Sequence, residues 1–310
     1  MELPAELTRN AVAAWGEDGR AFIERLPEQV ATLVREWSLT LAQPYPMSFH
    51  WVCAVRLPDG GPAVLKLGPP GSPHLRQQAA TLRHFDGRGA VRLLAHDVAR
   101  GALLLERAVP GTPVSAVPPE LDVVATAAII TVVRRLHRPP GDRGELPDLL
   151  QNRRQSFVDH LACHPGDDPF PRRLVTRALG LLQELCASAS QEVVVHGDLH
   201  HDNVLRSSSS RSGAEPDPWL AIDPHGVVGD PGADVGAMLY NPALARRDPA
   251  LVRLVPARIE QLADGLALPL QRVIAWGFVE AVVSEVWTAE ERGPLTRALD
   301  VALALEPQLS

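Results

Sequence analysis

The chain has 310 residues, of which 45% are hydrophobic and 22% charged, and this composition excludes a disordered or collagen-like protein. Its formal net charge of −7 argues against non-specific binding to nucleic acid, because such binding depends on basic surfaces. A cationic small-molecule partner fits this acidity better, although mild acidity is also common among cytosolic proteins. The three cysteines are widely spaced and form no CxxC pair, so the sequence predicts neither a disulfide framework nor a zinc site.

The N-terminal sequence MELPAELTRN lacks the basic start and the apolar run of a signal peptide. No later stretch reaches the length of about 18 apolar residues that a membrane-spanning helix needs. We therefore expect a cytoplasmic protein without membrane contact. The sequence fits a monomer and a dimer equally well.

The chain begins with a predicted helix followed by a predicted hairpin. Apolar residues recur at helical spacing from Phe22 to Trp37, which predicts an amphipathic helix. Residues 51–68 contain two apolar runs around Asp59-Gly60-Gly61, a sequence typical of a hairpin turn. Lys66 falls on the second strand of this hairpin. A lysine in a strand is commonly a solvated edge residue, so its burial depends on whether both faces of the sheet are covered.

A small sheet with one further helix completes the first third of the chain. Residues 72–87 predict a helix that starts near Ser72 and stops at Gly87. Residues 90–111 predict two strands joined at Ala99-Arg100-Gly101. Together with the hairpin, this order predicts a small mixed sheet.

After Pro110-Gly111 the pattern becomes mainly helical, and we place a domain boundary there, with residues 1–108 before it and 109–310 after it. Helical periodicity marks residues 121–138, 172–189, 251–266 and 272–287. One β-like island, residues 192–226, interrupts these helices. Its Ser-, Gly- and Pro-rich part, residues 206–218, predicts a flexible surface loop.

The island carries the residues most indicative of chemistry. His196-Gly197-Asp198 is followed by Asn203 at the spacing that separates the catalytic Asp of kinases from a metal-binding Asn. Asp223 ends the apolar run WLAI, where a second metal-binding carboxylate would stand. Phosphoryl transfer depends on alignment and charge neutralisation, so few residues suffice for its core. The pattern predicts that Asp198 orients the acceptor hydroxyl or accepts its proton, and that Asn203 and Asp223 bind Mg²⁺.

Simpler explanations exist for each part of this pattern. HGD alone can form a turn, and Asp223 alone can cap a helix. The histidines His196, His200 and His201 also suggest zinc, but the adjacent pair would point in different directions in any regular conformation. The alternative is that His196 hydrogen-bonds the catalytic loop.

The segments HGDLHHDN, AIDPHG and GDPGADVGAMLYNP together resemble the aminoglycoside phosphotransferase family, in its streptomycin 6-phosphotransferase and hydroxyurea phosphotransferase branch. The likeness extends to AVLKLG, DGRGAVRLLAHD and GALLLERAVPG, and covers about residues 45–245. It implies a protein-kinase-like α+β fold, with an N-terminal nucleotide-binding sheet lobe, a mainly helical C-terminal lobe that carries catalysis and the acceptor, and the nucleotide between them. It also implies ATP, or another nucleoside triphosphate, and Mg²⁺ as cofactors.

The resemblance also implies roles by position. Lys66 matches the lysine that binds nucleotide phosphates, and Asp198 matches the catalytic base. Asn203 and Asp223 match the magnesium ligands, and Asp234 matches an acidic residue that braces the catalytic loop. The same comparison implies that the segment from Glu106 to Ala108 is the hinge that contacts adenine through its backbone.

Two positions depart from the family pattern. Gln78 stands where a helix glutamate commonly pairs with the lysine, so a neutral partner would hold Lys66 less firmly. Residues 44–52 occupy the position of the phosphate-covering loop but contain no glycine, which leaves Ser48 as the candidate phosphate contact or as a simple turn residue. These departures motivate the alternative of a catalytically inactive nucleotide-binding scaffold.

The predicted acceptor is a cation, and streptomycin is the leading candidate, which would make the protein an agent of antibiotic inactivation. Hydroxyurea or another metabolite is the alternative. Trp276 and Glu280 lie four residues apart on a predicted helix, as do Trp287 and Glu291, so each pair can present a ring and a carboxylate to a cation. Each pair equally fits a packed tryptophan beside a solvated glutamate. We select Glu280, Glu285 and Trp287 as candidate acceptor contacts.

Overall fold

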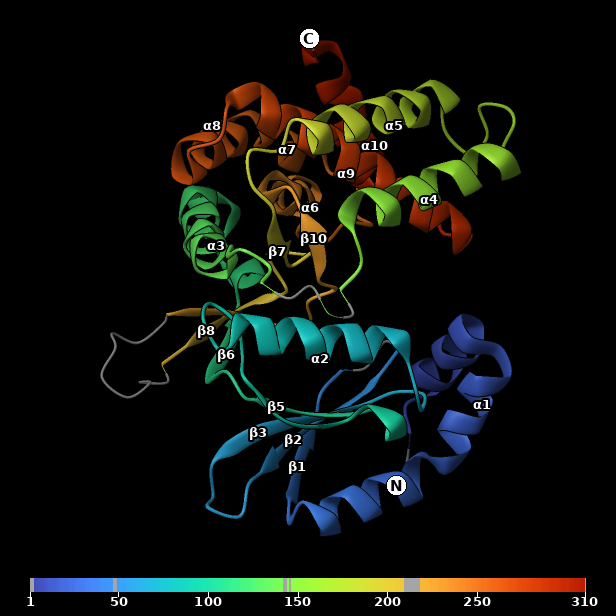
Figure 1. Ribbon diagram of the computed structural model, residues 1–310, viewed down its shortest axis with the longest axis vertical. Coiled ribbons are helices and arrows are strands. Elements are labelled where there is room, and N and C mark those ends of the chain that lie inside the picture. The colour runs from blue at the N-terminus through green and yellow to red at the C-terminus, as the bar shows by residue number, and fades with distance from the viewer. Residues whose placement is uncertain (1–2, 47–48, 142–143, 145, 209–217, 310) are drawn as a thin grey trace. The chain divides into compact units, whose positions relative to one another are not determined.

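The computed structural model describes residues 3–46, 49–141, 144, 146–208 and 218–309. These residues form two compact units (Figure 1). The first unit contains residues 1–87 and 91–108, and the second contains residues 88–90 and 109–310.

The first unit contains one sheet with the strand order β1-β2-β3-β5-β4. The strands are β1 (Thr40–Pro44), β2 (Trp51–Arg56), β3 (Pro62–Leu67), β4 (Leu93–Asp97) and β5 (Ala102–Glu106). The predicted hairpin is confirmed as β2 and β3, and its turn places Gly60 at a φ of 84°. Every neighbouring pair in the sheet is antiparallel, which differs from the predicted mixed sheet. Strands β3 and β4 do run in the same direction, but β5 lies between them.

Helices cover both faces of this sheet. The helix α1 (Ala5–Glu36), which bends at Gly16, shares one apolar core with the sheet residues Trp51, Leu65 and Leu67. The helix α2 (Pro73–Phe85) begins after Ser72, whose hydroxyl accepts a hydrogen bond from the Leu75 amide. Because side chains alternate along a strand, the residue between Leu65 and Leu67 points to the α2 face. Lys66 is therefore only 4% exposed.

The second unit is mainly helical. Its helices are α3 (Asp122–Leu136), α4 (Leu149–Cys163), α5 (Arg172–Ala187), α6 (Gly236–Tyr240), α7 (Pro249–Val252), α8 (Val255–Leu266), α9 (Leu270–Glu290) and α10 (Arg297–Leu305). Short 3₁₀ turns occur in the two units at Val98–Arg100, Val114–Ala116, Pro119–Leu121, Pro231–Val235 and Glu306–Gln308. The strand β7 (Val193–Val195) pairs with β10 (Val227–Gly229), and β6 (Pro110–Pro113), β8 (Val204–Ser207) and β9 (Trp219–Ala221) form a three-stranded sheet.

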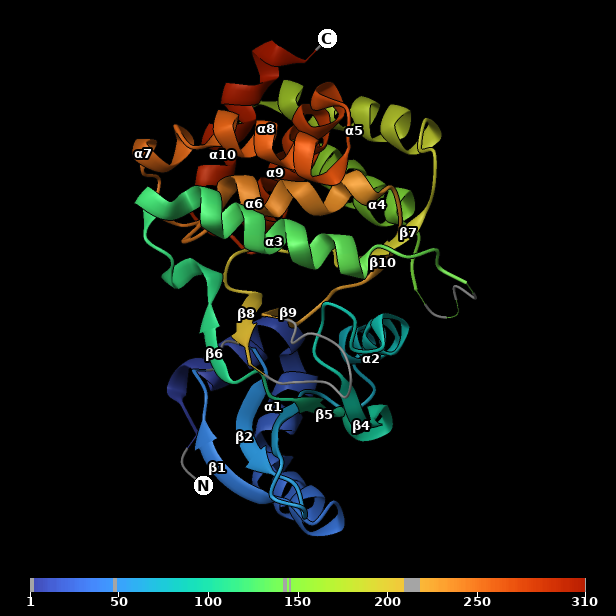
Figure 2. The same ribbon diagram turned by 90° about the vertical axis from the view of Figure 1, so that its left-hand side faces the viewer.

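The helix α9 forms the centre of the second unit. Every residue from Val273 to Val286 is buried, as expected for a helix that is apolar on most of its circumference. It contacts α4, α5, α6, α8 and α10, and α3 packs beside α8 (Figure 2). No helix within the described ranges is long and apolar enough to cross a membrane.

The sequence did not predict β1, β10, α4 or α10. For α4 the reason is chemical, since its buried face consists of Leu149, Arg153, Phe157 and His160. Two of these four residues are polar, so the apolar periodicity that marks a helix is weak. The burial of polar residues on this helix is the first sign that α4 contributes more than core packing.

Candidate active site

The loop between β7 and β8 holds His196, Asp198 and Asn203, and Asp223 follows β9. The His196 carbonyl accepts hydrogen bonds from the amides of His225 and Gly226, each at 2.9 Å. The Ile222 amide donates to the Asn203 carbonyl at 2.9 Å. These backbone contacts join His196, which precedes Asp198, to the segment that follows Asp223. They also join Asn203, at the end of the loop, to the residue that precedes Asp223.

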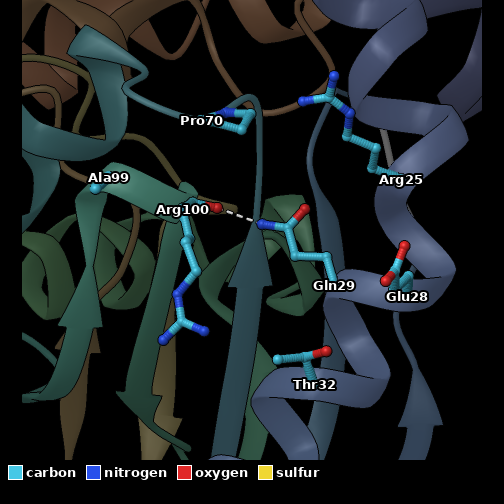
Figure 3. Close-up of a pocket in the computed structure, with 7 residues that line it drawn as sticks. All are labelled: Arg25, Glu28, Gln29, Thr32, Pro70, Ala99 and Arg100. Carbon is cyan, nitrogen blue, oxygen red and sulfur yellow. Dashed lines mark hydrogen bonds between the residues drawn. The ribbon is translucent and has the colours of Figure 1, made fainter.

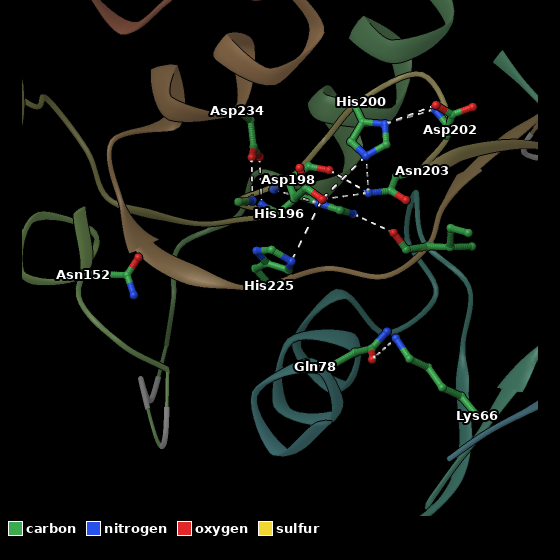
Figure 4. Close-up of polar contacts among 12 residues, drawn as sticks. Lys66, Gln78, Asn152, His196, Asp198, His200, Asp202, Asn203, His225 and Asp234 are labelled. Carbon is green, nitrogen blue, oxygen red and sulfur yellow. Dashed lines mark hydrogen bonds and ion pairs between the residues drawn. The ribbon is translucent and has the colours of Figure 1, made fainter. Parts of the chain in front are cut away.

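Asp234 braces this loop from the 3₁₀ turn after β10. Its carboxylate accepts hydrogen bonds from the amides of His196 (2.9 Å) and Gly197 (2.8 Å), and Figure 4 shows Asp234 beside His196. The Asp234 carboxylate also contacts His137 Nε2 at 2.9 Å. Burial raises the pKa of Asp234, but the hydrogen bond from His137 and the nearby charges outweigh it, so the pKa lies below its usual range. An ionised carboxylate, which only accepts, suits this set of donors.

His196 supports the loop as a neutral ring. Its Nε2 lies 2.9 Å from the Ile222 carbonyl, which only accepts, so Nε2 carries the proton. Its Nδ1 then accepts from the Asp198 amide at 3.3 Å. Burial lowers the pKa of His196, which favours the same neutral form. The side chain thus ties the backbone at Asp198 to the strand that leads to Asp223.

Asp198 presents a carboxylate whose side chain is 36% exposed. Its Oδ2 lies 3.6 Å from His200 Nε2 and 4.0 Å from His225 Nε2. Burial raises the pKa of Asp198, but the hydrogen bond and charge of His200, with the charges of His225 and His196, lower it below its usual range. The same proximity raises the pKa of His200 despite its burial, through Asp198, Asp202 and Asp223. Asp198 is therefore an ionised group that still reaches solvent.

Asn203 and Asp223 have the chemistry of magnesium ligands. Asn203 Nδ2 donates to the Asp198 carbonyl at 2.9 Å and to Asp198 Oδ2 at 3.2 Å. This commits the amide nitrogen and leaves the amide oxygen as the ligating atom. No three His, Cys, Asp or Glu side chains in the described ranges form a metal cluster. A pair of oxygen ligands nevertheless fits Mg²⁺, which commonly completes its shell with waters and substrate phosphates.

The first unit holds the remaining predicted nucleotide residues. Lys66 Nζ donates to Gln78 Oε1 at 3.0 Å, so the neutral partner expected from the sequence does meet the lysine. The Glu106 side chain is turned inward, where it accepts from the Arg92 amide at 3.0 Å. Ala108 is buried at the last residue of the unit. The Ser48 prediction falls outside the described residues.

The three candidate acceptor residues lie on α9 and are engaged with protein groups. Glu280 is 4% exposed, and its Oε1 lies 3.2 Å from Arg153 Nε. Glu285 accepts from the amides of Thr296 (2.9 Å) and Leu299 (3.1 Å), as a negative charge at the N-terminus of α10 would. Trp287 donates to the Ser156 hydroxyl at 3.0 Å.

Sequence reasoning did not identify Arg153, His137 or His225 as part of this region. Arg153 donates to the Gly197 carbonyl at 3.0 Å, and its guanidinium lies 4.7 Å from the Trp287 ring centre. These contacts join residues that are far apart in the chain, so no local spacing marks them.

Two cavities lie apart from the residues described above. One of about 260 Å³ in the first unit is lined by Arg25, Glu28, Gln29, Thr32, Pro70, Ala99 and Arg100, and Figure 3 shows Gln29 donating to the Arg100 carbonyl. The other, of about 200 Å³, lies in the second unit between α4, α5 and β10. Neither is lined by Lys66 or Asp198.

Comparisons with known proteins show the family of this chain. Residues 43–292 match the family described as aminoglycoside/hydroxyurea antibiotic resistance kinase. The chain is 32% identical to a streptomycin 6-kinase of Streptomyces glaucescens, over 98% of this chain and 96% of that protein. It is 33% identical to a hydroxyurea phosphotransferase of Kitasatospora aureofaciens, over 98% and 85% respectively.

A solved structure shares the fold at low sequence identity. The choline kinase LicA from Streptococcus pneumoniae superposes with a TM-score of 0.61 at 10% identity, over 93% of this chain and 98% of that one. This likeness confirms the predicted protein-kinase-like α+β fold. From the match over most of its length and the two relatives above 30% identity, the chain belongs to the aminoglycoside/hydroxyurea antibiotic resistance kinase family.

Proposed function

We propose that this kinase transfers the terminal phosphoryl group of ATP to a hydroxyl of streptomycin or a closely related aminoglycoside. The observation that carries the proposal is the contact between Asn203 and Asp198 within a loop that Asp234 braces. It joins a ligand for a hard cation to an ionised carboxylate that reaches solvent. The streptomycin 6-kinase relative supports the choice of acceptor.

In this mechanism Asp198 hydrogen-bonds the acceptor hydroxyl, aligns its oxygen with the phosphorus atom and takes its proton as the new bond forms. Lys66 binds phosphate oxygens of the nucleotide and offsets their charge. When bound by Asn203 and Asp223, Mg²⁺ supplies further neutralisation of phosphate charge. Asp234 and His196 hold the loop in place throughout, so little reorganisation accompanies the reaction.

The acceptor is identified by a panel assay with ATP and Mg²⁺. We expect streptomycin to gain one phosphoryl group, seen as ADP release and a matching rise in product mass. Because an acidic chain attracts a cationic acceptor through charge that salt screens, we expect added salt to raise the KM for streptomycin. Other aminoglycosides, hydroxyurea and choline complete the panel.

Each other outcome of the panel has a distinct meaning. The hydroxyurea phosphotransferase relative motivates the second candidate, and turnover of hydroxyurea without turnover of streptomycin would replace the proposed acceptor. Nucleotide binding without turnover on any compound, including a wider metabolite set, would support the inactive scaffold instead.

The Lys66–Gln78 pair gives a further prediction. Gln78→Glu turns a neutral hydrogen bond to Lys66 into a charge-assisted one, so we expect unchanged or tighter ATP binding and retained turnover. Lys66→Met removes the cation and should raise the KM for ATP about tenfold or more. Steady-state kinetics with varied ATP measure both. If Gln78→Glu were inactive but folded, the neutral partner would be a requirement rather than a tolerated departure.

A further inference from the structure

Gly197, the residue before Asp198, is held at both of its backbone polar groups. The Gly197 amide donates to Asp234 Oδ1 at 2.8 Å, and the Gly197 carbonyl accepts from Arg153 Nη2 at 3.0 Å. Gly197 has a φ of 82°, in the left-handed region that glycine adopts readily and other residues adopt rarely. A glycine at this position would leave the next side chain poorly fixed unless other groups restrain it. The brace by Asp234 is therefore half of a two-sided restraint.

Arg153 is itself fixed before it reaches the loop. It is 2% exposed, and its Nε lies 3.2 Å from Glu280 Oε1. Its Nη1 donates to Asn152 Oδ1 at 2.8 Å, and the Trp287 ring covers the guanidinium at 4.7 Å. The planar guanidinium directs each donor along a set line, so these contacts also set the direction of Nη2.

Trp287 is fixed in turn by the hydrogen bond from its indole nitrogen to Ser156, one turn along α4 from Asn152. Asn152 of α4 and Glu280 of α9 thus contact the edge of the guanidinium, and Trp287 of α9 covers one of its faces. The ion pair with Glu280 engages Nε, so the other N–H groups of the buried guanidinium need acceptors of their own. Nη2 finds its acceptor in the loop that carries Asp198.

We propose that Arg153 is a positioning residue for phosphoryl transfer, which sets the orientation of the Gly197–Asp198 peptide and thereby the place of the Asp198 carboxylate. The proposal rests on the proposed role of Asp198. A carboxylate that must align a hydroxyl with phosphorus tolerates little displacement, since a shift of about 1 Å can lower turnover about 100-fold. Arg153 contacts the loop at the Gly197 carbonyl, and in this proposal it acts on Asp198 through that contact.

The test compares Arg153→Lys with Arg154→Lys, the same change on the neighbouring, exposed residue of α4. Lysine keeps a positive charge opposite Glu280, but one nitrogen cannot replace the two that contact Glu280 and Gly197. With streptomycin as acceptor, we expect Arg153→Lys to lower kcat about 10- to 100-fold with the KM for ATP changed less than about threefold. Arg154→Lys should match the wild type.

Hydrogen exchange of the peptide spanning residues 193–205 provides a readout that needs no acceptor. We expect faster exchange of this peptide in Arg153→Lys, with the exchange of α9 and α10 unchanged. A second variant, Arg153→Met combined with Glu280→Met, removes both charges so that neither is buried alone, and should show the same loss of kcat.

The outcomes separate this proposal from the proposed function. If wild-type protein fails to phosphorylate streptomycin, the proposed acceptor fails, and loop exchange alone decides the role of Arg153. Unchanged loop exchange in a folded Arg153→Lys protein overturns the positioning role. So does a kcat within about threefold of wild type when streptomycin is turned over.

Discussion

Replacing Asp198 by Asn is expected to lower kcat by about 10²- to 10⁴-fold, the range usual for loss of a general base. The amide is nearly the same size as the carboxylate, so the loop should keep its fold. It no longer carries the negative charge that aligns a hydroxyl and takes its proton. Because the side chain meets the acceptor rather than the nucleotide, we expect the Kd for ATP to change less than about threefold. Steady-state kinetics and nucleotide titration measure the two quantities.

Asp202→Asn is the matched control for that experiment. Asp202 lies in the same loop, and its carboxylate accepts a hydrogen bond from Ser115. Its side chain is more exposed than that of Asp198. We expect turnover close to that of the wild type. Wild-type turnover in Asp198→Asn would remove Asp198 from the chemistry, and an equal loss in both variants would point to the loop's general electrostatics instead.

Loss of either proposed magnesium ligand is the second large effect. Asp223→Ala and Asn203→Ala each delete an oxygen ligand from a cation that proteins hold with few side chains. We expect the Mg²⁺ concentration for half-maximal turnover to rise by about tenfold or more, since one good ligand interaction is worth more than about 1.4 kcal/mol. Higher Mg²⁺ should restore part of the lost turnover. The measurement is a Mg²⁺ titration at fixed, saturating ATP.

Asp264→Asn, a carboxylate substitution on the exposed side of α8, controls for a general change in charge. Its magnesium dependence should match that of the wild type. If Asp223→Ala and Asn203→Ala also keep the wild-type dependence, the cation is held by other residues and the assignment of this pair is wrong. A loss that Mg²⁺ cannot restore, together with a lower melting temperature, would instead indicate damage to the loop.

Features set by neighbouring residues were determined by the sequence alone. The hairpin of β2 and β3 follows from an Asp-Gly-Gly turn between two apolar runs, and the start of α2 follows from Ser72. The spacing of Asp198 and Asn203 is local as well, so the motif could be found without a fold. Several short segments of this kind, taken in their order along the chain, indicated the kinase family, and the family match over residues 43–292 confirms it.

Tertiary structure decided what each polar group meets. Lys66 is buried because α1 and α2 cover opposite faces of its sheet, and a pattern within one strand cannot reveal both covers. Glu280 looked available for a cation, but α4 brings Arg153 to its carboxylate across 127 residues of sequence. The contact of Arg153 with Gly197 is likewise set by how α4 packs. A buried charge must find its partner wherever packing places one, so the partner carries no mark in the local sequence.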